Sequence, residues 1–201
     1  MPNHRQRGFT VLELLMALSL MGLMLLVAFT TFSIPFRAWM AGRKLADEQQ
    51  NARLLLEWMT RRLRLAGVGV TAGTAEYFTE AGPGAVTFQA DVDGTGGAEL
   101  HRFCIDTTTG IVREQIGVGV TTSCTTGAPL TSRGVRPLKV ALLRFAYFNG
   151  MQTPLTPLPL APEQRPDVTW VRVVLGLDSN LSGAYEAADD LTFTTDAIVR
   201  N

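Results

Sequence analysis

A long apolar stretch near the N-terminus restricts what this chain can fold into. Residues 14–34 are 21 consecutive residues without a charge, and apolar side chains dominate from Phe9 to Phe36. A helix needs roughly 20 such residues to cross the hydrocarbon core of a bilayer. Arg5 and Arg7 precede the stretch, so the positive-inside bias predicts a cytoplasmic N-terminus. The rest of the chain is then expected on the other side of the membrane.

One charge, Glu13, interrupts the apolar region and helps to distinguish the kinds of membrane segment. A secretory signal has an apolar part of about 7–15 residues that ends at a small-residue cleavage site, and this stretch is longer. An ordinary single-span anchor explains the length but not the carboxylate, which costs about 2.5–3.5 kcal/mol inside a spanning helix. Glu13 therefore needs a functional reason.

The residues around Glu13 resemble the class III signal of type IV prepilins. Residues 7–15 read Arg-Gly-Phe-Thr-Val-Leu-Glu-Leu-Leu. In that family a prepilin peptidase cuts after the glycine and methylates the new N-terminal amine. The resemblance implies cleavage between Gly8 and Phe9 and N-methylation of Phe9. It also implies a structural subunit that is not an enzyme and needs no cofactor.

The resemblance also implies a role in assembly for Glu13, which lies four residues beyond Phe9, the first residue after the cut. The methylated amine of Phe9 keeps its positive charge, and an unpaired charge in apolar surroundings is costly. We expect Glu13 of one subunit to pair with Phe9 of its neighbour and so to set the axial register. The alternative, that Glu13 only neutralises its own N-terminus, remains open.

The helix is expected to continue beyond the apolar stretch, from Phe9 to Ala66, with Pro35 as a possible kink and Gly67 as a stop. Its second half carries an apolar stripe with helical spacing, formed by Leu45, Ala52, Leu56, Met59, Leu63 and Ala66. Seven basic and three acidic residues lie between Arg37 and Arg64. We interpret them as a solvated helix face, with a specific docking surface as the alternative. Trp39 fits either an interfacial aromatic belt or core packing.

After Gly69 the pattern changes to short Val-, Thr-, Phe- and Ile-rich runs separated by glycines, which predicts strands and turns. The expected strands are 85–90, 100–106, 111–116, 138–148, 168–177 and 191–199, with 107–110 as a hairpin turn. Five prolines in 151–167 predict a surface loop. The fold class is therefore α+β and pilin-like, with an antiparallel sheet covering the apolar stripe of the long helix.

The expected division of the chain has four parts: a leader (1–8), a transmembrane or filament-core half of the helix (9–36), an amphipathic half (37–69) and a globular head (70–201). Short matches resemble PilW/PulJ-type minor pilins: residues 50–53 and 61–67 at the helix end, and 193–195 and 199–201 at the C-terminus. These matches suggest a minor subunit.

The head contains the two cysteines of the chain, Cys104 and Cys124. Outside the cytoplasm they are expected to form a disulfide, which would stabilise by about 3 kcal/mol, although free thiols remain an alternative. Asp91, Asp93 and Glu99 form a weak candidate calcium loop, for which a glycine-rich connection is the alternative. The head contains no CxxC motif and only one histidine, His101, so no metal site is predicted.

The sequence contains no catalytic or phosphate-binding motif, and its 18 basic and 18 acidic residues balance. The head shows no basic patch interleaved with aromatic residues, so the sequence does not suggest nucleic acid as a partner. The predicted function is a structural minor subunit of a type IV pilus or type II secretion pseudopilus, serving pilus biogenesis, protein secretion or DNA uptake. Its expected partners are the prepilin peptidase, sibling pilin or pseudopilin subunits and the inner-membrane assembly platform.

The expected location is the bacterial inner membrane, as a single-pass protein with a periplasmic head, and then the filament. The alternative function is a single-span anchored extracytoplasmic domain that binds a ligand or catalyses a reaction. That alternative predicts an uncleaved N-terminus and tolerance of substitutions at Glu13.

Overall fold

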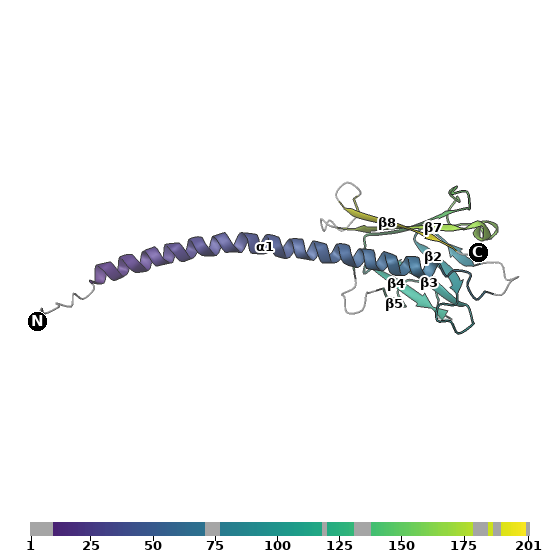
Figure 1. The fold of residues 1–201 in the computed structure, drawn as a ribbon, viewed down its shortest axis with the longest axis horizontal. Coiled ribbons are helices and arrows are strands. Elements are labelled where there is room, and N and C mark those ends of the chain that lie inside the picture. Colours follow the sequence, from purple (N-terminus) through teal and green to yellow (C-terminus); the bar gives the residue numbers. More distant parts are fainter. Residues whose placement is uncertain are drawn as a thin grey trace, which may run out of the picture. The chain divides into compact units, whose positions relative to one another are not determined.

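The computed structural model describes residues 10–70, 77–117, 120–130, 138–178, 185–186 and 190–199. The chain divides into two compact units, residues 1–46 and 47–201. One helix, α1 (Val11–Leu63), contributes to both units, and antiparallel strands follow it (Figure 1). The predicted α+β, pilin-like architecture is confirmed.

In the first unit, α1 presents its apolar side chains on every side. The large apolar residues from Val11 to Met40 are all more than half exposed. The helix continues through Pro35 and Gly42 without interruption. Leu45, which the sequence pattern placed in the apolar stripe, is 40 % exposed, so this part of the prediction is wrong.

In the second unit, the part of α1 from residue 47 onward supplies one wall of the hydrophobic core. The other members of the predicted stripe are buried, and Leu55, which the pattern omitted, is buried with them. α1 ends at Leu63, three residues before the expected Ala66. Gly67 has a φ of +89° and donates its N–H to the carbonyl of Gln89 at 2.8 Å. A left-handed glycine thus ends the helical path and ties it to the sheet.

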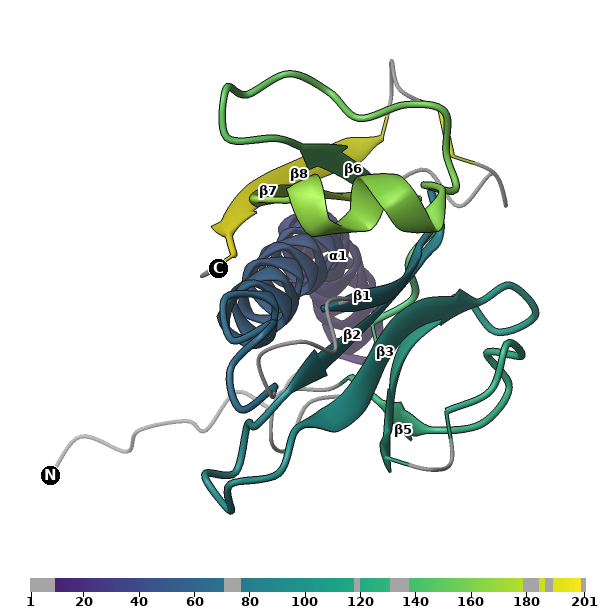
Figure 2. The same ribbon diagram turned by 90° about the vertical axis from the view of Figure 1, so that its right-hand side faces the viewer.

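Two antiparallel sheets form among the described residues, where the sequence suggested one. The five-stranded sheet has the order β1 to β5, and the three-stranded sheet has the order β6-β7-β8. Figure 2 shows the second-unit part of α1 lying between the two sheets. The strands are β1 (Phe78–Ala81), β2 (Ala85–Ala90), β3 (Glu99–Asp106), β4 (Ile111–Ile116), β5 (Ala128–Pro129), β6 (Leu142–Phe148), β7 (Trp170–Leu177) and β8 (Leu191–Ile198).

All six predicted strands are present, and the turn at 107–110 joins β3 to β4 as expected. Two short strands, β1 and β5, were not predicted. The proline-rich segment 151–167 is not a loop throughout, because Pro162–Asp167 forms a 3-10 helix, η2. Within the same segment Leu160 is 1 % exposed and belongs to the core. A proline-rich segment can therefore still contribute an anchoring side chain to the core.

Candidate functional site

The start of α1 is the first candidate site, and its predicted processing residues Gly8 and Phe9 lie outside the described residues. The first turn of the helix contains Glu13. The backbone N–H of Glu13 donates to the side-chain oxygen of Thr10 at 3.3 Å. Thr10 and Glu13 thus occupy the first and fourth positions of a capping box, Thr-x-x-Glu, in which the first side chain satisfies a free N–H of the helix end. This Thr-x-x-Glu pattern is readable in the sequence but was not among the expected features.

The apolar surface of α1 in the first unit is the second feature of this site. Within the described residues, one helix, α1, is long and apolar enough to cross a membrane. Its hydroxyl side chains are satisfied by the helix itself: Ser19 donates to the carbonyl of Met16, and Thr31 donates to the carbonyl of Val27 at 2.8 Å. The hydroxyls therefore add little cost in an apolar environment, where an unpaired polar group is expensive.

Trp39 follows the charge-free stretch and is 58 % exposed. Its ring stacks on Phe36 with centroids 6.2 Å apart, and the guanidinium of Arg43 lies 5.5 Å from its centroid. An amphipathic aromatic side chain beside a cation suits the interface between a bilayer and water. The exposure of Trp39 argues against core packing, and the belt position stays a prediction.

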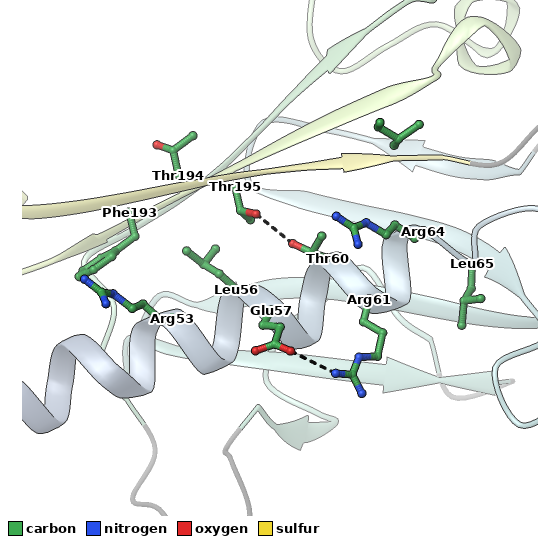
Figure 3. Close-up of a pocket in the computed structure, with 11 residues that line it drawn as sticks. Arg53, Leu56, Glu57, Thr60, Arg61, Arg64, Leu65, Phe193, Thr194 and Thr195 are labelled. Atoms are coloured by element: carbon green, nitrogen blue, oxygen red, sulfur yellow. Dashed lines mark hydrogen bonds and ion pairs between the residues drawn. The ribbon is translucent and has the colours of Figure 1, made fainter.

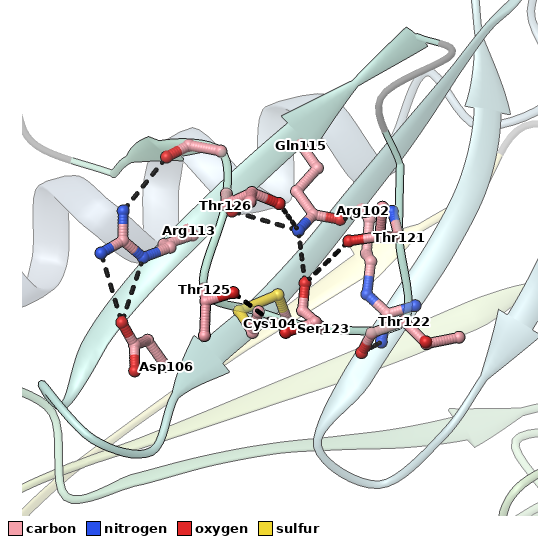
Figure 4. Close-up of a disulfide and its surroundings, with 12 residues drawn as sticks. Arg102, Cys104, Asp106, Arg113, Gln115, Thr121, Thr122, Ser123, Thr125 and Thr126 are labelled. Atoms are coloured by element: carbon pink, nitrogen blue, oxygen red, sulfur yellow. Dashed lines mark hydrogen bonds and ion pairs between the residues drawn. A yellow bond between two sulfur atoms is a disulfide. The ribbon is translucent and has the colours of Figure 1, made fainter.

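The structure joins Cys104 and Cys124 in a disulfide, with the Cα atoms 5.9 Å apart (Figure 4). Cys104 lies in β3 and is buried. The loop that carries Cys124 is held a second time by the buried Gln115 of β4. The Nε2 group of Gln115 donates to the carbonyl of Ser123 at 2.7 Å and to that of Thr126 at 3.1 Å. A covalent link and a buried amide thus fix the same loop.

The acidic loop does not have the character of an open cation site. Asp91 accepts hydrogen bonds from the N–H groups of Gly94 (2.8 Å) and Gly96 (2.9 Å), so its carboxylate organises the turn. Asp93 accepts from the hydroxyl and the N–H of Thr95, and these bonds lower the pKa of its carboxyl below the usual value. Glu99 is the first residue of β3. Among the residues that the structure describes, no cluster of three potential metal ligands occurs.

A buried polar cluster lies between α1 and the five-stranded sheet, and no sequence pattern predicted it. Glu114 of β4 accepts a hydrogen bond from the indole N–H of Trp58 at 3.3 Å. Its other carboxylate oxygen lies 3.3 Å from Nδ1 of His101 and 3.7 Å from Nε of Arg62. The ring of His101 stacks on Phe88, with centroids 5.6 Å apart. The cluster links the helix to the sheet through charge-assisted contacts, and we interpret it as structural.

Comparison with known proteins gives a match at the N-terminal end of the chain. Residues 3–29 match the family model described as Prokaryotic N-terminal methylation motif. No curated protein and no solved structure matches the chain. The matched segment contains Gly8, Phe9 and Glu13, so the chain carries a prepilin-like class III signal. Its features are those of a type IV pilin-like or pseudopilin-like prepilin, and pilin-like proteins with this motif are structural subunits.

Proposed function

We propose that this protein is a minor subunit of a type IV pilus or a type II secretion pseudopilus, cut between Gly8 and Phe9 and assembled through α1. The methylation motif at residues 3–29 carries the proposal. Most of the motif lies in α1, whose apolar side chains are uncovered on all sides in the first unit. Such a surface needs lipid before assembly and the helices of other subunits afterwards, because exposed apolar area is costly in water.

The same proposal gives the chain an orientation and a set of partners. Arg5 and Arg7 would stay in the cytoplasm until the prepilin peptidase removes the leader, and the head would lie in the periplasm. The disulfide between Cys104 and Cys124 suits that oxidising compartment. The assembly platform of the inner membrane would then pass the subunit to its sibling pilins or pseudopilins. Protein secretion, twitching and DNA uptake all use such subunits, and the proposal covers all three.

Glu13 has two possible roles that the structure makes separable. One is to pair with the methylated amine of Phe9, in a neighbouring subunit or in its own chain, and the other is to complete the capping box with Thr10. Glutamine serves at the fourth position of a capping box as glutamate does, but it carries no charge. Glu13→Gln therefore removes the charge and keeps the cap. Thr10→Val removes the cap, at about 1 kcal/mol, and keeps the charge.

The first measurement is the mature N-terminus by mass spectrometry of the protein from its native host. A chain that begins at methylated Phe9 supports the proposal, and an intact Met1 contradicts it. The second measurement is the amount of each variant in purified filaments. We expect Glu13→Gln and Glu13→Val to be cleaved normally but depleted from filaments, and Thr10→Val to incorporate close to the wild-type level. Normal incorporation of both Glu13 variants would rule out the pairing role.

A further inference from the structure

A groove in the second unit runs between α1 and β8, the outer strand of the three-stranded sheet (Figure 3). Its volume is about 980 Å³. Its floor includes Leu56 and Thr60 of α1, and the hydroxyl of Thr60 lies 3.3 Å from that of Thr195 in β8. The groove does not involve the start of the helix, the disulfide or the buried cluster around Glu114.

The wall of the groove on the β8 side is a strand edge, and each backbone N–H and C=O of β8 can be assigned either to the side that pairs with β7 or to the opposite side. The N–H of Val199 donates to the carbonyl of Thr169 at 2.9 Å, which fixes the alternation of the β7-β8 ladder. In an antiparallel pair, every second residue directs its N–H and C=O to the partner strand, and the residues between direct them away. The residues of β8 that direct these groups away from β7 are therefore Thr192, Thr194, Asp196 and Ile198.

This edge is unpaired in the part of the chain that the structure describes, since none of those four residues makes a backbone hydrogen bond there with a segment other than β7. Thr194 lines the groove although its side chain points away from α1 in Figure 3, so its backbone faces the groove. Natural sheets protect an open edge with lysine, proline or a bulge. β8 contains neither residue, and its register with β7 is continuous over all eight residues.

The wall of the groove on the α1 side is basic. Arg53, Arg61 and Arg64 line it together with one carboxylate, Glu57, which pairs with Arg61 at 3.1 Å. Arg53 and Arg64 are exposed, and within the described ranges neither has an ion-pair partner. The groove itself therefore carries a net charge of +2, from three arginines and one glutamate. Asp196, on the outer edge, is neutralised by a two-point contact with Arg172, at 2.8 and 3.0 Å.

We propose that this groove binds an extended acidic segment of another subunit, which adds to the three-stranded sheet as a fourth strand beside β8. The main-chain groups of Thr194 and its alternate neighbours would give the strand its hydrogen bonds. The three arginines of the groove would select acidic side chains on the face of that strand directed at the helix. Only the source of the segment, a sibling subunit, rests on the proposed function. The recognition of an acidic strand rests on the groove alone.

The test uses the full chain in detergent micelles and a fluorescently labelled ten-residue peptide in which glutamate alternates with valine and threonine. Binding is followed by fluorescence anisotropy. The same peptide with lysine in place of glutamate is the charge control, and we expect it not to bind. Raising the salt concentration should weaken binding of the acidic peptide, since the ion pairs are exposed. Equal binding of both peptides would overturn the proposal.

Strand addition is tested separately from charge by two further acidic peptides, methylated on the backbone nitrogens of alternate residues. One peptide carries the methyl groups on the odd residues and the other on the even residues. Only one edge of an added strand can face β8, so one methylated set should abolish binding and the other should retain it. Equal effects of the two sets contradict strand addition.

The groove is assigned by a triple variant, Arg53→Gln, Arg61→Gln and Arg64→Gln. We expect its affinity for the acidic peptide to fall on the order of tenfold, as the loss of three exposed ion pairs implies. The matched control makes the same change at three exposed arginines outside the groove, Arg37, Arg43 and Arg144, and should bind as the wild type does. Equal losses in the two variants would refute the assignment.

A second copy of this chain is the other possible occupant. The proposal would be overturned, and the groove assigned to that copy, by two results together. The wild type would self-associate but not bind the acidic peptide, and the groove variant would no longer self-associate. Peptide binding requires neither cleavage after Gly8 nor the charge of Glu13. A negative result here therefore leaves the proposed function standing, and a negative N-terminal result leaves the peptide result standing.

Discussion

Removing the disulfide gives a prediction whose size follows from the structure. The bond closes a loop between positions 20 residues apart, Cys104 and Cys124. In the chain-entropy model, a cross-link over a loop of this length removes enough freedom from the unfolded chain to stabilise the fold by about 3 kcal/mol at 25 °C. We expect the variant Cys104→Ala/Cys124→Ala to lose that amount of unfolding free energy.

The folded structure of the variant should change little, because the loop keeps its second attachment. Gln115 is 2 % exposed, and its Oε1 accepts the N–H of Thr121 at 3.0 Å in addition to the bonds that Nε2 makes. A buried amide with several partners is costly to release, since an unsatisfied group loses about 1–3 kcal/mol. The loss in the cysteine variant should therefore come mainly from the unfolded state.

The assay is guanidinium unfolding of the full chain in detergent micelles, followed by the fluorescence of Trp58 and Trp170 in the second unit. Wild-type protein with a reductant should unfold at the same denaturant concentration as the cysteine variant, and the variant should not respond to the reductant. A loss below about 1 kcal/mol would refute the entropic reasoning. So would a near-ultraviolet circular dichroism spectrum of the native variant that differs clearly from that of the wild type.

Three further predictions concern the second unit. Met59→Ala should lower its unfolding free energy by about 2–5 kcal/mol because Met59 is fully buried, whereas Leu54→Ala, at a residue 39 % exposed, should cost far less in the same unfolding assay. Glu114→Ala should cost about 3–5 kcal/mol in denaturant unfolding, since it leaves the side chains that contact Glu114 unpaired in a buried site. The third prediction concerns pH: hydrogen bonds from Thr109, and then from neighbouring amides and Arg113, hold the pKa of Asp106 below its usual value. The carboxyl of Asp106 therefore takes up a proton more readily in the unfolded chain than in the folded one. Its contribution to the unfolding free energy should be full above about pH 4 and should fall as the pH decreases through the lowered folded pKa. Asp106→Asn should flatten that part of the stability profile, measured from about pH 2 to 6.

The elements with strong local patterns were predictable from the sequence. The strands 85–90 and 111–116 begin and end as expected, because glycines and turn residues interrupt the apolar runs on both sides. The long helix was equally evident. β1 and β5 were missed because four and two residues are too short to show an alternating pattern.

Other features depend on contacts between distant segments, which no local pattern contains. Leu45 continues the helical spacing of the stripe but is 40 % exposed, so the spacing of apolar residues along a helix does not tell at which residue their burial ends. Glu114 and His101 are charged or titratable residues in predicted strands, and composition alone assigns such residues to solvent. Their burial follows from the packing of α1 on the five-stranded sheet, which brings Trp58 and Arg62 to the same place.

The basic residues of α1 show the same limit most clearly. The seven basic residues from Arg37 to Arg64 were expected to form one solvated face, but in the structure they have different surroundings. Arg62 contacts the buried carboxylate of Glu114, Arg43 lies over the ring of Trp39, and Arg53, Arg61 and Arg64 line the groove beside β8. Each of these residues carries the same single positive charge, so a charge count does not distinguish their positions. What distinguishes the three groove arginines is the open strand edge beside them, and that edge exists only because β8 is the last strand of its sheet. The proposed docking role of this face therefore depends on sheet order, a property that the helix sequence does not encode.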